Sequence, residues 1–349
     1  MIKVGIIGCG KIAEVRHAPE YADNPDCELT AFFDEIPGRA ESYVKKYGGK
    51  AYDNVDELLA SGVDAVSVCV ANTAHAPISI KALEAGVHVL CEKPMATTLK
   101  DCEAMVKASE KSGKFLMIGQ NQRLARAHIK AKELIEAGEI GRILSFRTTF
   151  GHPGPEGWTG SKNSWFFDKK RAAFGAMADL GVHKTDLIHF LTGDVITEVT
   201  AQISTLDKKY PDNTPIDVDD NAYSIYRTRG GIIGTMHVSW TFYGDEDNST
   251  ILYGTEGVIR CYNDPKYSLI VETKDGGRTF YMLDQMTSNK EQTTGGRTNT
   301  GVIDTFIKCL RTNTPPAISG KEAMKAMKVI FAAEESAKRN CTVKVAQDE

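Results

Sequence analysis

The stretch that decides the fold stands at the start of the chain: Ile2-Lys3-Val4-Gly5-Ile6-Ile7-Gly8-Cys9-Gly10-Lys11-Ile12-Ala13. Its apolar first half predicts a short buried strand, and the pattern Gly8-x-Gly10-x-x-Ala13 follows at once. Gly8 permits a tight turn, Gly10 lets the backbone approach a pyrophosphate, and Ala13 allows a helix to pack close to the strand. The amides at the start of that helix can bind phosphate. We therefore predict a dinucleotide-binding turn with cofactor contacts from Gly8, Gly10, Lys11 and Ile12.

The residue after the second predicted strand bears on the choice of cofactor. That strand covers residues 27–33 and ends in Asp34. A carboxylate there accepts hydrogen bonds from the adenosine ribose and repels a 2′-phosphate, which favours NAD over NADP. Arg39 and Lys45 follow closely enough to weaken this exclusion, so NADP stays open as a second cofactor. We predict cofactor contacts from Asp34 and Arg39; an ordinary turn aspartate beside Pro37-Gly38 is the structural alternative.

Strands and helices alternate through the first third of the chain. Short apolar runs that end at turn residues predict strands, and the segments between them carry apolar residues at helical spacing. The further predicted strands lie near residue 51 and at 63–70, 87–91 and 115–118, and two of the helices lie at 73–85 and 99–112. This order is typical of a doubly wound parallel sheet of the Rossmann type.

The pattern changes near residue 120. From residue 196 onward, most segments alternate with the period of two that is typical of half-buried strands. Two closing helices are predicted near 301–311 and 321–338. We therefore predict an α/β protein with a dinucleotide-binding domain over residues 1–122 and an α+β domain with a large, mainly antiparallel sheet over residues 123–349.

Composition narrows the class of protein. The chain has 349 residues and a net charge of −4. This length suffices for two domains, and the mixed charge gives no basis for a nucleic-acid or membrane partner. No apolar stretch reaches the roughly 18 residues of a membrane span. The eight cysteines show no paired spacing, which favours a reducing, cytoplasmic compartment. Apart from the segment around Asp179 and His189 described below, the histidines do not cluster with cysteines or carboxylates at ligand spacing, so we expect no metal.

A second informative stretch is Ala85-Gly86-Val87-His88-Val89-Leu90-Cys91-Glu92-Lys93-Pro94-Met95-Ala96. It predicts a strand that starts after a helix-ending glycine and stops at Pro94, because proline cannot continue a central ladder. Lys93 should therefore lie where the strand leaves the sheet, at the edge where open α/β sheets bind ligands. We predict that Glu92 and Lys93 line the cofactor crevice; the alternative for Lys93 is a solvated surface lysine.

A third stretch runs from Gly175 to Asp186 and contains Asp179 and His183. These two residues are four apart and would share one face of a helix. A carboxylate in that position can orient an imidazole and favour its charged form, which makes the imidazole a usable general base near neutral pH. A surface pair is the structural alternative. Asp186 and His189 lie on the same predicted helix, so a metal site is a further alternative, although the sequence indicates no additional ligand for it.

Taken together, the glycine-rich turn, the Glu92-Lys93-Pro94 block and the Gly175-to-Asp186 block resemble the Gfo/Idh/MocA family. That family comprises NAD(P)-dependent oxidoreductases of sugars and polyols, inositol dehydrogenase among them, and the resemblance covers essentially the whole chain. It implies that Lys93, Asp179 and His183 are catalytic and contact the substrate. His183 would remove a hydroxyl proton while hydride leaves the same carbon, Asp179 would orient His183, and Lys93 would donate a hydrogen bond to the oxygen.

Other positions resemble the family less specifically, and they are polar residues that follow predicted strands. They imply cofactor contacts from Asn72, His75 and Gln120 and a substrate contact from Arg123. The chain departs from the family pattern at Ala71, where a proline is common, and at Ala173-Phe174, where the family has glycines. A phenylalanine there should reshape the substrate pocket, so no particular sugar specificity is carried over.

Aromatic residues gather before the third stretch. We predict substrate contacts from His152, Trp158 and Trp165, because aromatic rings stack on the apolar face of a sugar while polar neighbours bind its hydroxyls. A loop that caps the core is the alternative.

We therefore predict a dehydrogenase that transfers a hydride between a secondary hydroxyl of a sugar, polyol or sugar derivative and a nicotinamide cofactor. Two alternatives stay open: an NAD-dependent elimination or glycoside cleavage without net redox change, and a catalytically silent sugar or NAD sensor. We also expect a homodimer or homotetramer that forms through the C-terminal sheet. The predicted strand over 235–243 has one face that is only partly polar, and a neighbouring strand adds Tyr223, Ile225 and Tyr226. Neither face of this sheet is therefore expected to be fully solvated.

Overall fold

The computed structural model describes residues 1–162, 164–286 and 300–347. The chain forms two compact units. The first contains residues 1–120, 170–173 and 300–324, and the second contains the described residues of 121–169, 174–286 and 325–347. The sequence-based division at residue 122 assigns residues 300–324 to the second domain, whereas here they pack with the first unit. One contact that holds them there is the hydrogen bond from the amide of Ile118 to the carbonyl of Ile318, at 3.0 Å.

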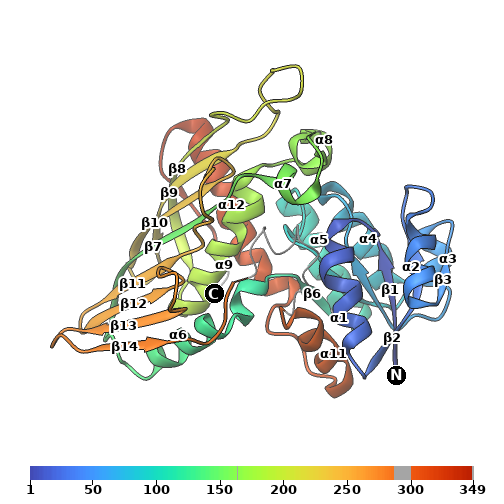
Figure 1. Ribbon diagram of the computed structural model, residues 1–349, viewed down its shortest axis with the longest axis horizontal. Helices are drawn as coiled ribbons and strands as arrows, with labels where there is room; N and C mark the ends of the chain where they lie inside the picture. Colours follow the sequence, from blue (N-terminus) through green and yellow to red (C-terminus); the bar gives the residue numbers. More distant parts are fainter. Residues whose placement is uncertain (163, 287–299, 348–349) are drawn as a thin grey trace. The chain divides into compact units, whose positions relative to one another are not determined.

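The first unit is built on a six-stranded parallel sheet in the order β3-β2-β1-β4-β5-β6 (Figure 1). Its strands are β1 (Ile2–Ile7), β2 (Cys27–Phe33), β3 (Lys50–Ala51), β4 (Ala65–Val68), β5 (His88–Cys91) and β6 (Leu116–Ile118). The order reverses between β1 and β4, and doubly wound sheets bind ligands at such a reversal, beyond the carboxyl ends of the strands. The predicted Rossmann-type sheet is confirmed.

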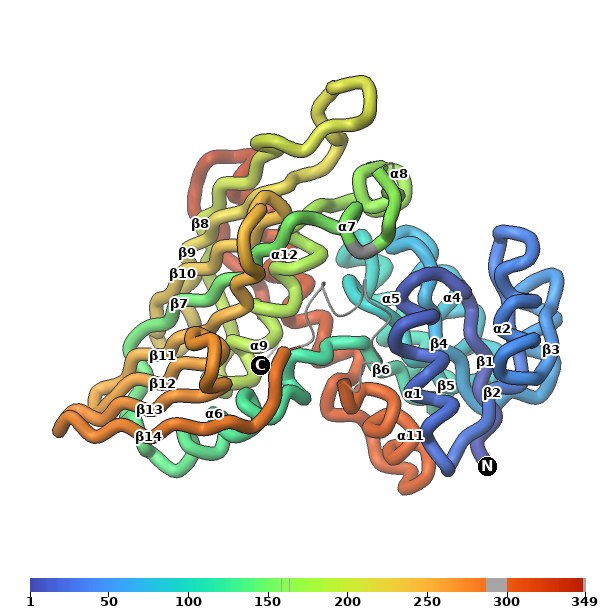
Figure 2. Tube along the Cα trace, viewed as in Figure 1, coloured from blue at the N-terminus to red at the C-terminus, as the bar shows by residue number. Residues whose placement is uncertain are grey.

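Helices connect these strands. A helical run starts at Lys11, widens into a π turn over Ala13–His17 and continues as α1 (Ala18–Asp23). The others are α2 (Arg39–Tyr47), α3 (Val55–Leu59), α4 (Asn72–Glu84), α5 (Leu99–Ser112) and α11 (Val302–Thr312). Helix α4 packs beside α5, and α11 packs beside α1 (Figure 2). The central strand β1 is apolar, so its inner residues Val4, Ile6 and Ile7 are fully buried.

The second unit is built on a nine-stranded sheet in the order β14-β13-β12-β11-β7-β10-β9-β8-β15. Its strands are β7 (Ile143–Gly151), β8 (Ile196–Ser204), β9 (Asn221–Thr228), β10 (Ile233–Ser239), β11 (Thr250–Gly254), β12 (Gly257–Cys261), β13 (Leu269–Thr273), β14 (Arg278–Tyr281) and β15 (Val343–Lys344). Neighbouring strands are antiparallel except β7 and β10, which are parallel. The prediction of a large, mainly antiparallel sheet is confirmed.

Helices α6 (Arg126–Glu136), α9 (Val182–Thr192) and α12 (Gly320–Arg339) lie along one face of this sheet (Figure 1). The remaining short elements are 3-10 turns over Asn121–Leu124 and Trp165–Phe167, α7 (Pro155–Thr159), α8 (Lys169–Ala172) and a π turn over Met177–Gly181 that leads into α9. Among the helices of the described ranges, none is both long and apolar enough to cross a membrane.

Candidate active site

The glycine-rich turn after β1 leaves its backbone open. Gly8 has a φ of +93°, and a Cβ there would lie 2.5 Å from the carbonyl oxygen of Cys69, so only glycine fits. At Gly10, a Cβ would meet no described heavy atom within 4 Å. The helical run begins at Lys11, and the first amides of a helix have no acceptor within it. Ile12 is the second residue of this helical run. The backbone amides of the turn and of the first helical residues therefore fit the pyrophosphate of a dinucleotide.

Asp34 follows β2 directly and ties the glycine-rich turn to the end of that strand. Its buried carboxylate accepts hydrogen bonds from the amides of Cys9 (2.7 Å) and Ile36 (2.8 Å). The half-exposed guanidinium of Arg39 lies 3.7 Å from the same group. A carboxylate has about four acceptor positions, so Asp34 keeps capacity for a ribose hydroxyl beside these contacts.

Asn72 and His75, both predicted as cofactor contacts, bind backbone of the first unit. Asn72 begins α4 and donates from its amide to the carbonyl of Ala172 at 2.9 Å. The ring of His75 lies between the carbonyl oxygens of Pro94 (2.7 Å) and Val70 (3.2 Å), and burial lowers the pKa of this imidazole. His75 therefore holds the turn that follows β5.

Gln120, the third predicted contact of this kind, behaves differently. It follows β6 and is 1% exposed. Neither the oxygen nor the nitrogen of its amide has a hydrogen-bond partner among the described residues. Buried amides are almost always paired, so this orphaned group points to a bound ligand or water. With the open glycine-rich turn and Asp34, it shows that the residues at this sheet edge fit a dinucleotide.

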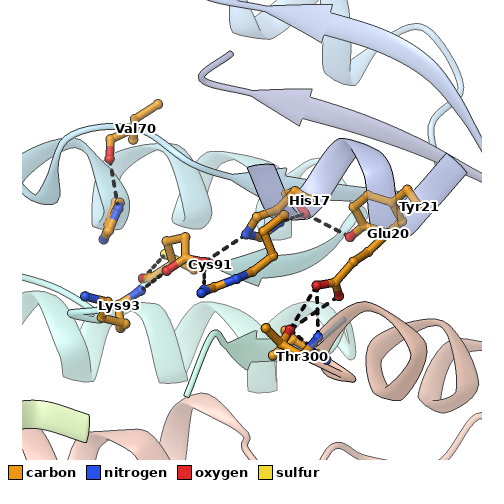
Figure 3. Close-up of polar contacts among 12 residues, drawn as sticks. His17, Glu20, Tyr21, Val70, Cys91, Lys93 and Thr300 are labelled. Atoms are coloured by element: carbon orange, nitrogen blue, oxygen red, sulfur yellow. Dashed lines mark hydrogen bonds and ion pairs between the residues drawn. The ribbon is translucent and has the colours of Figure 1, made fainter. Parts of the chain in front are cut away.

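Lys93 follows β5 at the carboxyl edge of the parallel sheet, as the proline after it predicts, and the Lys93–Pro94 peptide is cis. Its own amide donates to the carboxylate of Glu92 at 3.2 Å. Glu92 is buried and also contacts Arg16 and His17. Figure 3 labels His17 in this region, together with Cys91 and Lys93. Burial alone would raise the pKa of Glu92, but the hydrogen bond from His17 and the charges of Arg16 and Lys93 outweigh it and hold that pKa far below its usual range.

Asp179 and His183 lie in the second unit, where the π turn over Met177–Gly181 meets α9. Both side chains are mostly buried, with 8% of Asp179 and 6% of His183 exposed. The carboxylate of Asp179 accepts a hydrogen bond from the indole nitrogen of Trp240 at 3.1 Å, and Trp240 is fully buried. The ring of Phe150 lies 6.1 Å from that of His183. A buried carboxylate with a fixed donor is thus set on the same helical run as an imidazole.

The start of this helical run is held by a second buried carboxylate. Asp219 accepts the amides of Gly175 (2.8 Å) and Met177 (2.7 Å), which would otherwise be unpaired at the helix start. Burial raises the pKa of Asp219 to about 7, although the two amides oppose the shift. A Cβ at Gly175 would lie 1.7 Å from the carbonyl oxygen of Asp219, so this contact requires glycine.

Arg123 and the imagined metal ligands have partners of their own. The guanidinium of Arg123 forms two hydrogen bonds with the carboxylate of Asp186, at 2.5 and 2.6 Å, and both groups are buried. His189 accepts the amide of Ile196 at 3.1 Å. Within the described ranges, no three His, Cys, Asp or Glu side chains gather as metal ligands. Arg123 therefore supports α9 through Asp186.

The aromatic segment before Asp179 packs on Trp240. Phe166 and Phe167 contact the ring of Trp240 at centroid distances of 6.4 and 6.0 Å, and Trp165 stacks on Phe166 at 4.0 Å. His152 is 3% exposed and accepts the amide of Gly154. The side chain of Trp158 lies outside the described residues. The segment is thus linked to Asp179 through Trp240.

Comparison with known proteins identifies the family. Residues 2–120 match the oxidoreductase family with an NAD-binding Rossmann fold, and residues 128–260 match the GFO/IDH/MocA C-terminal domain. The chain belongs to the Gfo/Idh/MocA family. It is therefore an oxidoreductase with an NAD-binding domain.

Three similar proteins illustrate this membership. Over 351 residues, the chain is 27% identical to myo-inositol 2-dehydrogenase of Thermotoga maritima, covering 99% of this chain and 98% of that protein. Over 233 residues, it is 35% identical to glucose-6-phosphate 3-dehydrogenase of Bacillus subtilis, covering 64% and 63%. A solved structure of levoglucosan dehydrogenase with NADH and levoglucosan superposes with a TM-score of 0.87 and 26% identity, covering 99% and 100%.

Several residues of this Gfo/Idh/MocA protein that support the site are not apparent from its sequence. Trp240, which binds Asp179, reads only as a core residue of an alternating segment, and Asp219 reads as an ordinary loop carboxylate. Arg16 and His17 lie in the helix predicted after the glycine-rich turn, and no local sequence pattern indicates that they contact Glu92. No local pattern marks Asp219 as a cap, because the amides of Gly175 and Met177 lie 44 and 42 residues earlier in the chain.

Proposed function

We propose that this protein is an NAD-dependent dehydrogenase that oxidises a ring secondary hydroxyl of a sugar, polyol or sugar derivative, with Lys93, Asp179 and His183 as its catalytic residues. The observation that carries the proposal is the buried Asp179–Trp240 contact on the helical run of His183. The relatives are named for myo-inositol, glucose 6-phosphate and levoglucosan, which are all rings with several secondary hydroxyls.

The first unit would hold NAD through the glycine-rich turn, Asp34 and the amide of Gln120. The open backbone at Gly10 and the orphaned amide of Gln120 support this assignment. When bound, NAD supplies the acceptor for the hydride. Asp34 disfavours a 2′-phosphate by charge repulsion, so NAD is the preferred form.

The protein's own residues would handle the proton and the developing charge. In the proposed mechanism the imidazole of His183 accepts the proton of the substrate hydroxyl. Asp179, held by Trp240, orients that imidazole and stabilises its charged form. The ammonium of Lys93 donates a hydrogen bond to the substrate oxygen and stabilises its negative charge as it becomes a carbonyl.

The proposal is tested with purified protein, NAD or NADP, and a panel of inositols, sugars, sugar phosphates and sugar acids, with identification of the product. We expect NADH and a keto product from at least one compound. His183→Ala should then lose about 10²- to 10⁴-fold in turnover, as expected for a general base. It should keep NAD affinity, because the dinucleotide turn belongs to the first unit. Normal turnover of the variant, or a product without net oxidation, would contradict the proposal.

We further propose a homodimer or a dimer of dimers formed through the open face of the nine-stranded sheet. Tyr223 and Ile225 on β9 are 53% and 54% exposed, and Ile233 on β10 is 41% exposed. Because β9 and β10 are neighbours, these side chains form one apolar patch of the kind that marks interfaces. Tyr226, counted with them from sequence, lies on the opposite face and is fully buried. Light scattering should report a dimer or tetramer for the wild type and a smaller species for Ile225→Lys; a wild-type monomer at micromolar concentration would rule the assembly out.

We place the enzyme in the cytoplasm, a reducing compartment, because all eight cysteines are free thiols and seven are buried.

A further inference from the structure

Two neighbouring residues of the first helical run reach the same buried carboxylate. Arg16 and His17 lie in the π turn over Ala13–His17, and π turns recur at functional sites. The ring nitrogen Nε2 of His17 lies 2.8 Å from an oxygen of Glu92, and the guanidinium of Arg16 lies 3.6 Å from the same oxygen. Figure 3 shows His17 beside the strand end that carries Cys91 and Lys93.

The hydrogen bonds on the two sides of the His17 ring have assignable donors and acceptors. An ionised carboxylate can only accept, so Nε2 of His17 donates to Glu92. In the neutral ring Nδ1 then accepts from the hydroxyl of Ser67 at 3.0 Å, and Ser67 accepts from the hydroxyl of Tyr21 at 2.8 Å. Ser67, Tyr21 and His17 are all fully buried. Every member of this chain is satisfied, and such networks fix the rotamers of their members.

Glu92 connects this hydrogen-bonded chain to the backbone of Lys93. Its second oxygen accepts the amide of Lys93 at 3.2 Å. The space on its far side is closed, because a Cβ at Gly119 would lie 3.2 to 3.3 Å from the carboxylate atoms. The residue after Lys93 is held too, since His75 lies 2.7 Å from the carbonyl oxygen of Pro94. The backbone of Lys93 is therefore restrained on both sides by buried polar groups.

We propose that His17 is a positioning residue for Lys93 and acts through the carboxylate of Glu92. The inference rests on the proposed role of Lys93 at the substrate oxygen. His17 contacts neither substrate nor cofactor in this account. It fixes the carboxylate that fixes the peptide from which the lysine side chain extends. A displacement of a reacting group by about 1 Å can cost 10²-fold in rate, so the restraint bears on turnover.

A pair of substitutions separates positioning from simple stabilisation of the fold. In His17→Gln the amide reaches the place of Nε2 and can still donate to Glu92. In His17→Asn the amide takes the place of Nδ1, so it keeps the contact with Ser67 and loses Glu92. His17→Asn removes a donor from the ionised Glu92, whereas His17→Gln gives up only a neutral hydrogen bond to Ser67, so His17→Asn should lose more thermal stability. The kcat of each variant is therefore measured well below its own melting temperature. Tyr21→Phe removes the far end of the chain and serves as a control.

We expect His17→Asn to lose about 10- to 100-fold in kcat while its Kd for NAD stays within about threefold of wild type. His17→Gln and Tyr21→Phe should keep kcat within about threefold. Equal kcat values for the Asn and Gln variants, or a loss that follows melting temperature alone, would overturn the role of His17. If the Asn variant does not fold, Gly119→Ala is used instead, because its Cβ would lie 3.2 to 3.3 Å from the Glu92 carboxylate and crowd it. This variant should lower kcat, and an unchanged kcat overturns the inference as well.

Lys93→Met separates this inference from the proposed function. A severe loss of kcat in Lys93→Met with no difference between the two His17 variants refutes the positioning role and leaves the catalytic role of Lys93 intact. A Lys93→Met enzyme with normal kcat refutes the role of Lys93, and with it the basis for positioning.

Discussion

Trp240→Phe is the substitution that bears most directly on the candidate site of the second unit. It removes the indole N–H that lies 3.1 Å from the carboxylate of Asp179. It keeps a phenyl ring against Phe166 and Phe167, which pack around Trp240 in the wild type. The carboxylate of Asp179 would then lose a fixed donor at a position that is only 8% exposed, where water replaces it poorly.

The size of the effect follows from the charge of the acceptor. A hydrogen bond to a charged group contributes about 1.5–3 kcal/mol, roughly twice the value for neutral partners. If the whole of that energy holds Asp179 in the orientation that serves His183, its loss lowers kcat about 10- to 150-fold, since each 1.36 kcal/mol is a factor of ten. The smaller ring costs a further amount of stability, about 1–3 kcal/mol, which must be controlled separately.

Phe167→Leu provides that control. Phe167 is 2% exposed and packs on the same indole, so shrinking it loosens the aromatic cluster while the Trp240 donor remains. Both variants are assayed for kcat, melting temperature and Kd for NAD with a substrate found in the panel. We expect similar losses in melting temperature, unchanged Kd, and a loss of kcat confined to Trp240→Phe. If the two variants keep the same kcat, the contact between Trp240 and Asp179 does not serve catalysis.

Two further predictions concern charge. Asp34→Ala should narrow the gap in kcat/KM between NAD and NADP by removing repulsion of the 2′-phosphate, and a wild type that already uses NADP as well as NAD would show that Asp34 has no such role. Burial lowers the pKa of Lys184 from 10.5 to about 7, so the folded protein binds fewer protons than the unfolded chain between these values, and this group's contribution to the free energy of unfolding rises with pH across that window. In urea titrations, the free energy of unfolding of Lys184→Met minus that of wild type should therefore fall between pH 7 and pH 9.5; a constant difference would mean that Lys184 titrates normally.

Local sequence signals predicted the architecture because they report on the backbone. The tight turn at Gly8 and the exit of the chain at Lys93-Pro94 are steric properties of glycine and proline, so they can be inferred without knowing any partner. The period of two over β9 and β10 reports which side chains face the core. These signals place candidate groups on strand ends and helices, and the structure finds them there.

The groups that hold the candidates could not be inferred in the same way, because they come from distant parts of the chain. Trp240 is separated from Asp179 by 61 residues, and His17 is separated from Glu92 by 75. Their meeting depends on sheet order and strand register, which hydrophobic periodicity does not contain. For the same reason the sequence did not show that Asn72 and Arg123, predicted as ligand contacts at strand ends, also bind Ala172 and Asp186.

The π turns are the second feature that periodicity misses, and they affect what four-residue spacing means. In an α-helix of 3.6 residues per turn, residues four apart overshoot one turn by about 40°. A π turn has more residues in each turn, so the same spacing advances through a smaller angle. Asp179 lies in such a turn and His183 is the second residue after it, so their angular offset differs from that in an uninterrupted α-helix. The π turn over Ala13–His17 likewise presents two consecutive side chains, Arg16 and His17, to one carboxylate. In both units a widened turn thus lies next to the residues to which we assign chemistry, so a helix predicted from spacing alone names the candidates and leaves out their relative orientation.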